Sequence, residues 1–184
     1  TVIWPVFYKD ADNNLDALMA RVDEKNSAIR AFLVLQGFDY EEISVSAPSI
    51  VDKYAQEYNQ SERGFRYVAK AGMTVFSHTP DKVKTAFSQL SQLAKQGIAI
   101  TQDDYQNRVE YMFTQLNDIK PEMVQLATQK AREVALKFAK DSDSQLGKIK
   151  SARQGQFSIR DRDSNTPHIK LVRVVTSVEY YLAD

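Results

Sequence analysis

Apolar residues recur at helical spacing in three stretches of the chain, at residues 15–33, 79–97 and 118–140. In each stretch they recur every three or four residues and leave the opposite side polar, which is typical of an amphipathic helix. Between these stretches, apolar and polar residues alternate one by one. Such alternation predicts strands with one face buried and one exposed.

Local signals place the ends of the expected helices. Asn13 or Asn14 can cap the first helix, and Gly37 can end it. The second helix is expected to begin at residues 79–81, where a threonine hydroxyl for capping is followed by proline and an acid of the first turn. Gly97 follows its last apolar residue, and the third helix has Pro121 in its first turn.

The expected strands cover residues 65–76, 109–113 and 169–181, with a further long strand over residues 42–57. We expect the strand over residues 42–57 to be broken or bulged at Ala47–Pro48, because proline cannot donate a ladder hydrogen bond. Gly72, inside the strand expected over residues 65–76, predicts a bulge or a close backbone approach at that position.

Several strands lie close enough in sequence to pair as hairpins, which are antiparallel. The sequence therefore predicts an α+β fold, in which three amphipathic helices pack on one face of a mixed or mostly antiparallel sheet and a strand-helix-strand-strand pattern recurs. The length of 184 residues suits a single domain over residues 1–184. It also allows two intertwined subdomains, about residues 1–60 with the C-terminal strands and about residues 61–160.

Composition excludes several classes of function. The chain has 24 basic and 24 acidic residues, so it has no net positive charge to attract nucleic acid. It has no cysteine, which excludes thiol catalysis, disulfide bonds and a zinc site built from cysteines. The sequence contains no run of about 18 apolar residues, so it predicts no transmembrane helix. The chain opens on a predicted strand with no signal peptide, so we expect a leader to have been removed.

No catalytic, cofactor-binding or metal site is predicted. We interpret His78 and His168 as solvated turn histidines. Residues 161–165 resemble the opening of a calcium loop, but Thr166 and Pro167 follow where the loop needs a glycine and further ligands. A polar hairpin tip explains this segment better. Phosphate loops and nucleophile motifs are absent from the sequence.

Two features suggest an interaction surface. Aromatic residues lie on both sides of a turn at residues 59–64, where they could stack on a ligand or pack across a hairpin. Leu136 projects from the charged side of the third helix and could contact another subunit. The candidate surface consists of Tyr54, Tyr58, Phe65, Tyr67 and Leu136.

Three segments carry a resemblance to a known family: residues 37–50, residues 65–83, and the third helix with the residues that follow it. In the helix, alanines recur every four residues, from Ala127 to Ala139. Over residues 40–182 the chain resembles the SIMPL domain family, also called the domain-of-unknown-function 541 family. The opening TVIWPVFYKDADNNL departs from that family's glycine-rich first strand and Pro-Asp turn.

The resemblance implies a secreted, periplasmic or cell-envelope protein that forms homo-oligomers, with stress-related roles proposed for some members. It transfers no catalytic residue. We therefore expect a non-enzymatic, self-assembling envelope protein whose protein partner is unknown. The alternative is a module that binds a small ligand or peptide at an exposed sheet edge or at the aromatic hairpin.

Overall fold

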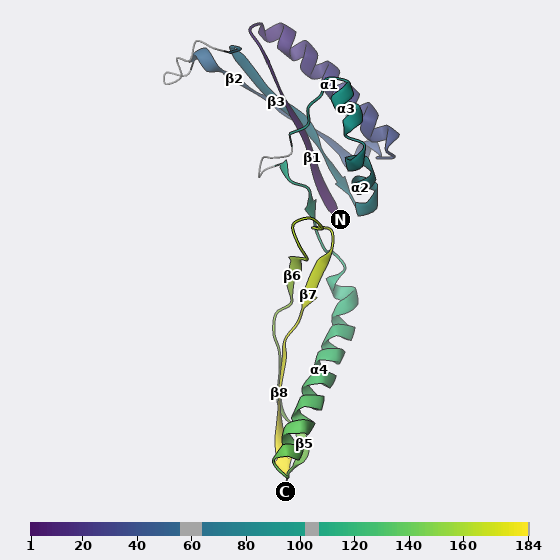
Figure 1. The fold of residues 1–184 in the computed structure, drawn as a ribbon, viewed down its shortest axis with the longest axis vertical. Helices are drawn as coiled ribbons and strands as arrows, with labels where there is room; N and C mark the ends of the chain where they lie inside the picture. The colour runs from purple at the N-terminus through teal and green to yellow at the C-terminus, as the bar shows by residue number, and fades with distance from the viewer. Residues whose placement is uncertain (56–63, 102–106, 184) are drawn as a thin grey trace. The chain divides into compact units, whose positions relative to one another are not determined.

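The computed structural model describes residues 1–55, 64–101 and 107–183 of the chain. It divides the protein into two compact units, Thr1–Met112 and Phe113–Asp184. Each unit is a contiguous stretch of the chain; the sequence pattern predicted a single domain over residues 1–184 and also allowed two intertwined subdomains. Figure 1 shows the elements of both units.

Unit 1 contains a four-stranded sheet. Its strands are β1 (Val2–Asp12), β2 (Ile43–Asp52), β3 (Tyr67–Ser77) and β4 (Glu110–Tyr111), in the order β2-β3-β1-β4. Every pair in this sheet is antiparallel. The α+β fold expected from the sequence is confirmed, with the fully antiparallel form of the sheet.

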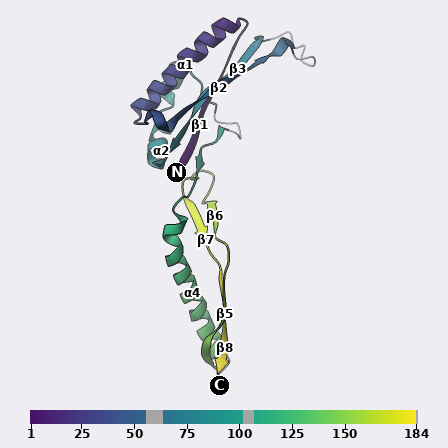
Figure 2. The ribbon, with the colours of Figure 1, turned by 180° about the vertical axis from the view of Figure 1, so that it is seen from behind.

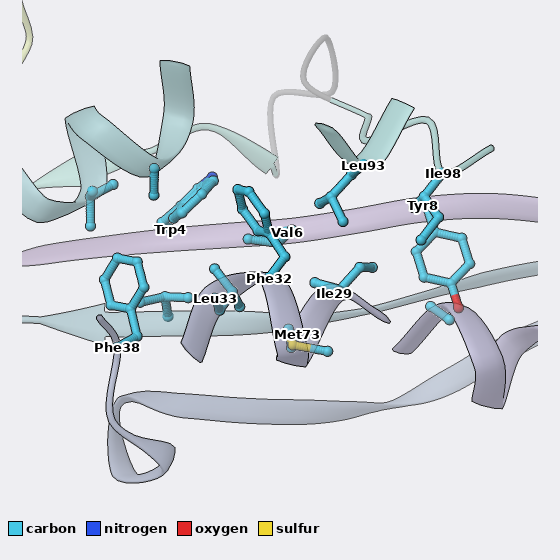
Figure 3. Close-up of a cluster of buried hydrophobic side chains, with 14 of the residues drawn as sticks. Trp4, Val6, Tyr8, Ile29, Phe32, Leu33, Phe38, Met73, Leu93 and Ile98 are labelled. Atoms are coloured by element: carbon cyan, nitrogen blue, oxygen red, sulfur yellow. The ribbon is translucent and has the colours of Figure 1, made fainter. Parts of the chain in front are cut away.

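One face of this sheet forms the core. On β1 and β3 every second side chain is buried, as the alternation predicts: Val2, Trp4, Val6 and Tyr8 on β1, and Ala69, Ala71, Met73 and Val75 on β3. Helices cover this face, and Figure 3 shows their apolar side chains meeting those of the strands. Burying each large aliphatic side chain contributes about 1.5–3 kcal/mol, so this cluster dominates the stability of unit 1.

Helix α1 (Leu15–Leu35) forms as expected and supplies five buried residues: Leu18, Val22, Ile29, Phe32 and Leu33. The side chain of Asn14 caps it by accepting a hydrogen bond from the Ala17 N–H at 3.0 Å. At the other end Gly37 adopts a φ of 88°, and the Phe38 N–H donates to the Leu33 carbonyl at 3.1 Å. This is a Schellman ending, in which only glycine takes the left-handed position without strain.

The second predicted helix is in fact two, α2 (Pro80–Ser88) and α3 (Ser91–Lys95). The hydroxyl of Ser88 donates to the Thr85 carbonyl at 2.7 Å, which is the acceptor that the Gln89 N–H needs to continue the helix. The Gln89 N–H bonds instead to the Ala86 carbonyl at 3.0 Å. Local side-chain competition of this kind explains the break. Pro80 takes the first helical position, but the Thr79 side chain makes no capping bond.

The predicted irregularities of the strands are confirmed. The register of β2 on β3 shifts between Ser46 and Ser49, and β2 ends at Asp52 in a short 3-10 turn (Lys53–Ala55). A second 3-10 turn, Tyr40–Glu42, precedes β2. Gly72 lies where β3 passes so close to β1 that a Cβ atom would stand 2.1 Å from the Val6 carbonyl oxygen.

Unit 2 consists of one helix and a long two-stranded ribbon. Helix α4 (Leu116–Asp141) runs beside the ribbon, as Figures 1 and 2 show, and Pro121 lies in its second turn. The ribbon pairs β5 (Gln145–Gln154) with β8 (Thr176–Ala183), and β6 (Ser158–Asp161) with β7 (Lys170–Arg173).

The single strand expected over residues 169–181 is therefore two strands, β7 and β8. Between the two ladders, residues 155–157 lie opposite residues 174–175, so one side of the ribbon has an extra residue. Such a mismatch interrupts pairing in the manner of a β-bulge. One hydrogen bond, from the Gly155 N–H to the Val175 carbonyl at 2.8 Å, links the two ladders.

Candidate interaction surfaces

The aromatic hairpin predicted from the sequence is organised around Arg66. The Arg66 guanidinium donates to both carboxylate oxygens of Asp52, at 2.9 to 3.2 Å. It also lies over the rings of Tyr67 and Tyr54, with its carbon 4.8 Å and 5.7 Å from their centroids. The hydrogen bonds from Arg66 lower the pKa of Asp52. This arrangement ties the base of the β2–β3 connection together.

The aromatic candidates differ in how far their side chains are exposed. Phe65 is 53% exposed and Tyr54 is 65% exposed, so both present apolar surface to solvent. Tyr67 is half-buried against the core. Tyr58 lies outside the described residues. Arg66 contacts both Tyr54 and Tyr67, so it links two of the predicted aromatic residues.

An open hollow of about 520 Å³ lies beside Phe65. Its lining consists of Lys9, Asp10, Ala11, Asp12, Arg21, Phe65 and Val68. Three of its charged residues are paired: Asp10 accepts hydrogen bonds from Lys25 at 2.7 Å and from Arg21 at 3.2 Å. Arg21 also reaches Asp12 at 2.6 Å.

The ion pairs of the hollow fix its protonation. Burial opposes ionisation of Asp10, but the hydrogen bonds from Arg21 and Lys25 outweigh it and lower the pKa of Asp10 to about 2. Hydrogen bonds to Asp10 and Asp12 in turn raise the pKa of Arg21. A general acid or base needs a pKa near the working pH. These groups hold their charges at neutral pH, so they are suited to structure and not to proton transfer.

The other candidate sites of the sequence have structural partners. His78 is exposed, with Nδ1 3.2 Å from the Thr1 hydroxyl, whereas His168 is half-buried. The Asp163 carboxylate accepts hydrogen bonds from the Thr166 hydroxyl at 2.6 Å and from two backbone N–H groups of its own turn. Residues 161–165 therefore form the start of a polar hairpin tip between β6 and β7, as predicted. Among the described residues, no group of three acids or histidines is placed to hold a metal.

Helix α4 and the ribbon of unit 2 leave several apolar side chains uncovered. The ribbon covers one side of α4, marked by Ala131, Ala135 and Ala139. Ala139 alone among the described hydrophobic residues of this unit is fully buried. Val134 and Phe138 precede two of these alanines by one position and lie about 100° around the helix from them. They are 50% and 70% exposed, so the apolar stripe is wider than the ribbon that packs against it.

We call this side of the helix the α4 flank, and define it as Leu126, Lys130, Val134, Lys137 and Phe138. The amphipathic pattern of α4 places Leu126, Val134 and Phe138 on its apolar stripe, but such a pattern shows which residues share a side and not how much of that side a partner covers. The width of the apolar stripe along the helix is the feature of the sequence that could have indicated an uncovered part. Leu136 is 48% exposed on a different side of α4, and its role as a contact stays a prediction.

The ribbon is also apolar where it is exposed. Six of its large hydrophobic residues are between 39% and 60% exposed: Ile149, Ile159, Leu171, Val175, Tyr181 and Leu182. A hairpin packed on a single helix cannot enclose these side chains, because it has only one covered face. In this unit the Lys120 ammonium lies 5.8 Å from the centroid of Phe157, so the lysine stem adds some cover there.

Comparison with known protein families gives one match. Residues 1–174 match the model of the SIMPL family, which is described as "Protein of unknown function (DUF541)". A search of curated proteins finds no match. No helix among the described residues is both long and apolar enough to cross a membrane. The family match spans nearly the whole chain and includes the opening strand that departs from the expected form. The chain belongs to the SIMPL family, whose function is unknown.

Proposed function

We propose that the protein is a non-enzymatic component of the cell envelope that assembles with copies of itself through unit 2. The observation that carries this proposal is the uncovered apolar surface of α4 and its ribbon. Among the described residues of this unit, ten large hydrophobic side chains are 39–70% exposed and one alanine is fully buried. Groups of exposed apolar residues often mark surfaces that contact another protein.

The energies involved support assembly. Burying the exposed half of one Leu, Val or Phe side chain contributes about 1 kcal/mol. A single contact of this size cannot outweigh the entropy lost on association, which is at least about 4 kcal/mol. Several residues buried together can, and the flank supplies Leu126, Val134 and Phe138 on one side of one rigid helix. A two-stranded ribbon alone is also marginally stable, so contact with another chain would stabilise it.

Two facts support the envelope location. The chain resembles secreted and periplasmic members of its family, and it has no cysteine to form stray disulfides in an oxidising compartment. Cell fractionation with an antibody against the protein would test this. We expect the protein in the periplasmic or envelope fraction, and recovery with the cytosolic markers would contradict the location while leaving assembly untouched.

Light scattering after size exclusion, over a concentration series, would test assembly. The informative variant is Val134→Ser with Phe138→Ser, because both side chains are exposed and contribute little to the unit's own packing. We expect the wild-type protein to form a defined oligomer and this variant to dissociate. Leu136→Ser is the matched control, since it removes an equally exposed apolar residue from another side of the same helix.

If the control dissociates and the double variant does not, assembly stands but uses the Leu136 side. If the wild-type protein stays a single chain at every concentration, the proposed function is wrong.

A second function is favoured by one observation. Tyr54 and Phe65 expose aromatic surface, and Phe65 lines an open hollow, which suits an apolar or aromatic peptide side chain. Chemical-shift mapping with a panel of peptides and small aromatic ligands would test it. We expect shifts confined to residues near Phe65 that Phe65→Ala abolishes. Shifts that stay unmoved across the panel would end this alternative.

A further inference from the structure

The ribbon of unit 2 has two faces of different character. Over residues 171–181, along β7 and β8, every odd-numbered side chain is exposed and every even-numbered side chain is half-buried. Helix α4 packs against β8 and β5, and within unit 2 it lies on one side of the ribbon only, as Figures 1 and 2 show. The odd-numbered positions therefore mark an outer face that α4 does not cover.

Three arginines lie on this outer face. Arg173 occupies one of the odd-numbered positions itself. Residues directly opposite each other in an antiparallel pair point to the same face of the sheet. The register sets Arg160 opposite Leu171 and Arg153 opposite Ser177, so both belong to the outer face as well. All three arginine side chains are exposed.

No carboxylate of the described residues pairs with these arginines. Residues 144–183 contain seven basic and three acidic side chains, so the ribbon is locally positive although the whole chain is neutral. Each of the three acids lies near another basic residue of the ribbon: Asp161 near Lys170, Asp163 near Arg162, and Glu179 near Lys150. The guanidinium groups of the outer face therefore keep their hydrogen-bond donors available for an anion.

Apolar side chains stand among the arginines on the same face. Leu171 and Val175 are 42% and 50% exposed, and they occupy the outward positions on either side of Arg173. We call this surface the outer patch and define it as Arg153, Arg160, Leu171, Arg173 and Val175. At about 3.3 Å per residue, the strand over residues 171–177 spans about 20 Å, so the five side chains form one compact surface.

We propose that the outer patch binds the surface of a membrane that contains anionic lipids. Arginine binds phosphate groups through two parallel hydrogen bonds, and lipid headgroups present phosphates side by side. Apolar side chains between the arginines can enter the boundary between headgroups and acyl chains. A soluble polyanion offers no apolar layer, so it would leave Leu171 and Val175 in water. Membrane binding therefore uses all five residues of the patch.

This inference goes beyond the proposed function and does not depend on assembly. The α4 flank belongs to the helix on the other side of the ribbon, so it stays available for contact between copies. Each basic side chain close to an anionic membrane surface strengthens binding about fivefold, and three together strengthen it about a hundredfold.

Flotation of the full-length protein with lipid vesicles tests this binding. One set of vesicles contains phosphatidylcholine alone, and the other contains about one third phosphatidylglycerol, which is anionic. The test variant replaces the arginines of the patch: Arg153→Gln, Arg160→Gln and Arg173→Gln. The matched control removes three exposed charges elsewhere: Arg30→Gln, Arg132→Gln and Lys140→Gln. Circular dichroism with thermal unfolding checks that each variant folds.

We expect the wild-type protein and the control to float with the anionic vesicles and not with phosphatidylcholine alone. The arginine variant should bind the anionic vesicles about a hundredfold more weakly. Wild-type protein that stays unbound, an arginine variant that binds like the wild type, or a control that loses as much binding overturns the proposal.

A second variant separates a membrane from a soluble polyanion. Leu171→Ser with Val175→Ser keeps the three arginines and removes the apolar part of the patch. We expect this variant to bind anionic vesicles at least fivefold more weakly and to bind soluble polyphosphate as the wild type does. Vesicle binding that this variant retains in full would assign the patch to soluble polyanions and overturn the membrane proposal.

Discussion

Local rules account well for single residues of this protein. Asn14 caps a helix, Gly37 ends it in the left-handed conformation, and Gly72 allows two strands to approach closely. The first two roles depend on the residue and its immediate neighbours in the chain, whereas that of Gly72 depends on the strand beside it. The two glycines lead to direct measurements.

Gly72→Ala should destabilise unit 1 strongly. The new Cβ would stand 2.1 Å from the Val6 carbonyl oxygen, a contact that only movement of β1 can relieve. We expect a loss of about 2–4 kcal/mol in the free energy of unfolding, measured with urea. Gly37→Ala is the control, because a Cβ there meets nothing within 4 Å and only the φ of 88° opposes it. A loss of about 1 kcal/mol is expected for that variant. Equal losses for the two would contradict the close approach of the strands.

The ion pairs of Asp10 should give stability that depends on pH. The pKa of Asp10 is about 2 in the folded protein, below its ordinary value of 3.8, so its contribution is present above about pH 4. The contribution is lost as the pH falls toward 2, where the folded protein must also take up the proton. Asp10→Asn should therefore destabilise the protein by about 1–2 kcal/mol at pH 7, after discounting for solvent screening.

Urea unfolding at several pH values would measure this, and the difference between wild type and Asp10→Asn should shrink between pH 4 and pH 2. Glu24→Gln serves as the control, since Glu24 is exposed and unpaired within the described residues. A difference that stays constant with pH would show that Asp10 acts through something other than its charge.

At the scale of elements, periodicity predicted the helices and most strands, and it failed where a single side chain or a second element decides the outcome. The break between α2 and α3 depends on one hydroxyl, that of Ser88, competing for a carbonyl. The break between β7 and β8 depends on the number of residues in the opposite strand, which the strand's own sequence does not contain. The uncovered flank of α4 has the same origin, because only the ribbon's width shows how much of the stripe stays exposed.

The two sides of α4 should respond oppositely to substitution. Ala139→Leu would force extra volume between the helix and the ribbon, where the alanine is 2% exposed, and should destabilise unit 2 by about 1–3 kcal/mol. Phe138→Ser, at a side chain that is 70% exposed, should change that stability by less than about 0.5 kcal/mol in dilute protein. Hydrogen exchange of the α4 amides would measure both. A strong loss of protection in Phe138→Ser would place this residue in a packed interior.

At the scale of the whole molecule, the chain divides into two compact units, Thr1–Met112 and Phe113–Asp184. The family resemblance could be stated from the sequence and is confirmed over residues 1–174. The role of the aromatic candidates stays a prediction, and the exposure of Tyr54 and Phe65 could not be predicted because it depends on the hairpin that holds them. Assembly and location stay proposals.

The most direct test of the central claim is the solution mass of the wild-type protein, measured by light scattering over a concentration series. A single chain has a mass of 20.9 kDa. The uncovered apolar surface of unit 2 predicts a defined multiple of this mass that Val134→Ser with Phe138→Ser returns to one chain. A mass of one chain at every concentration would contradict self-assembly and leave the exposed aromatic residues near the hollow as the surface to study.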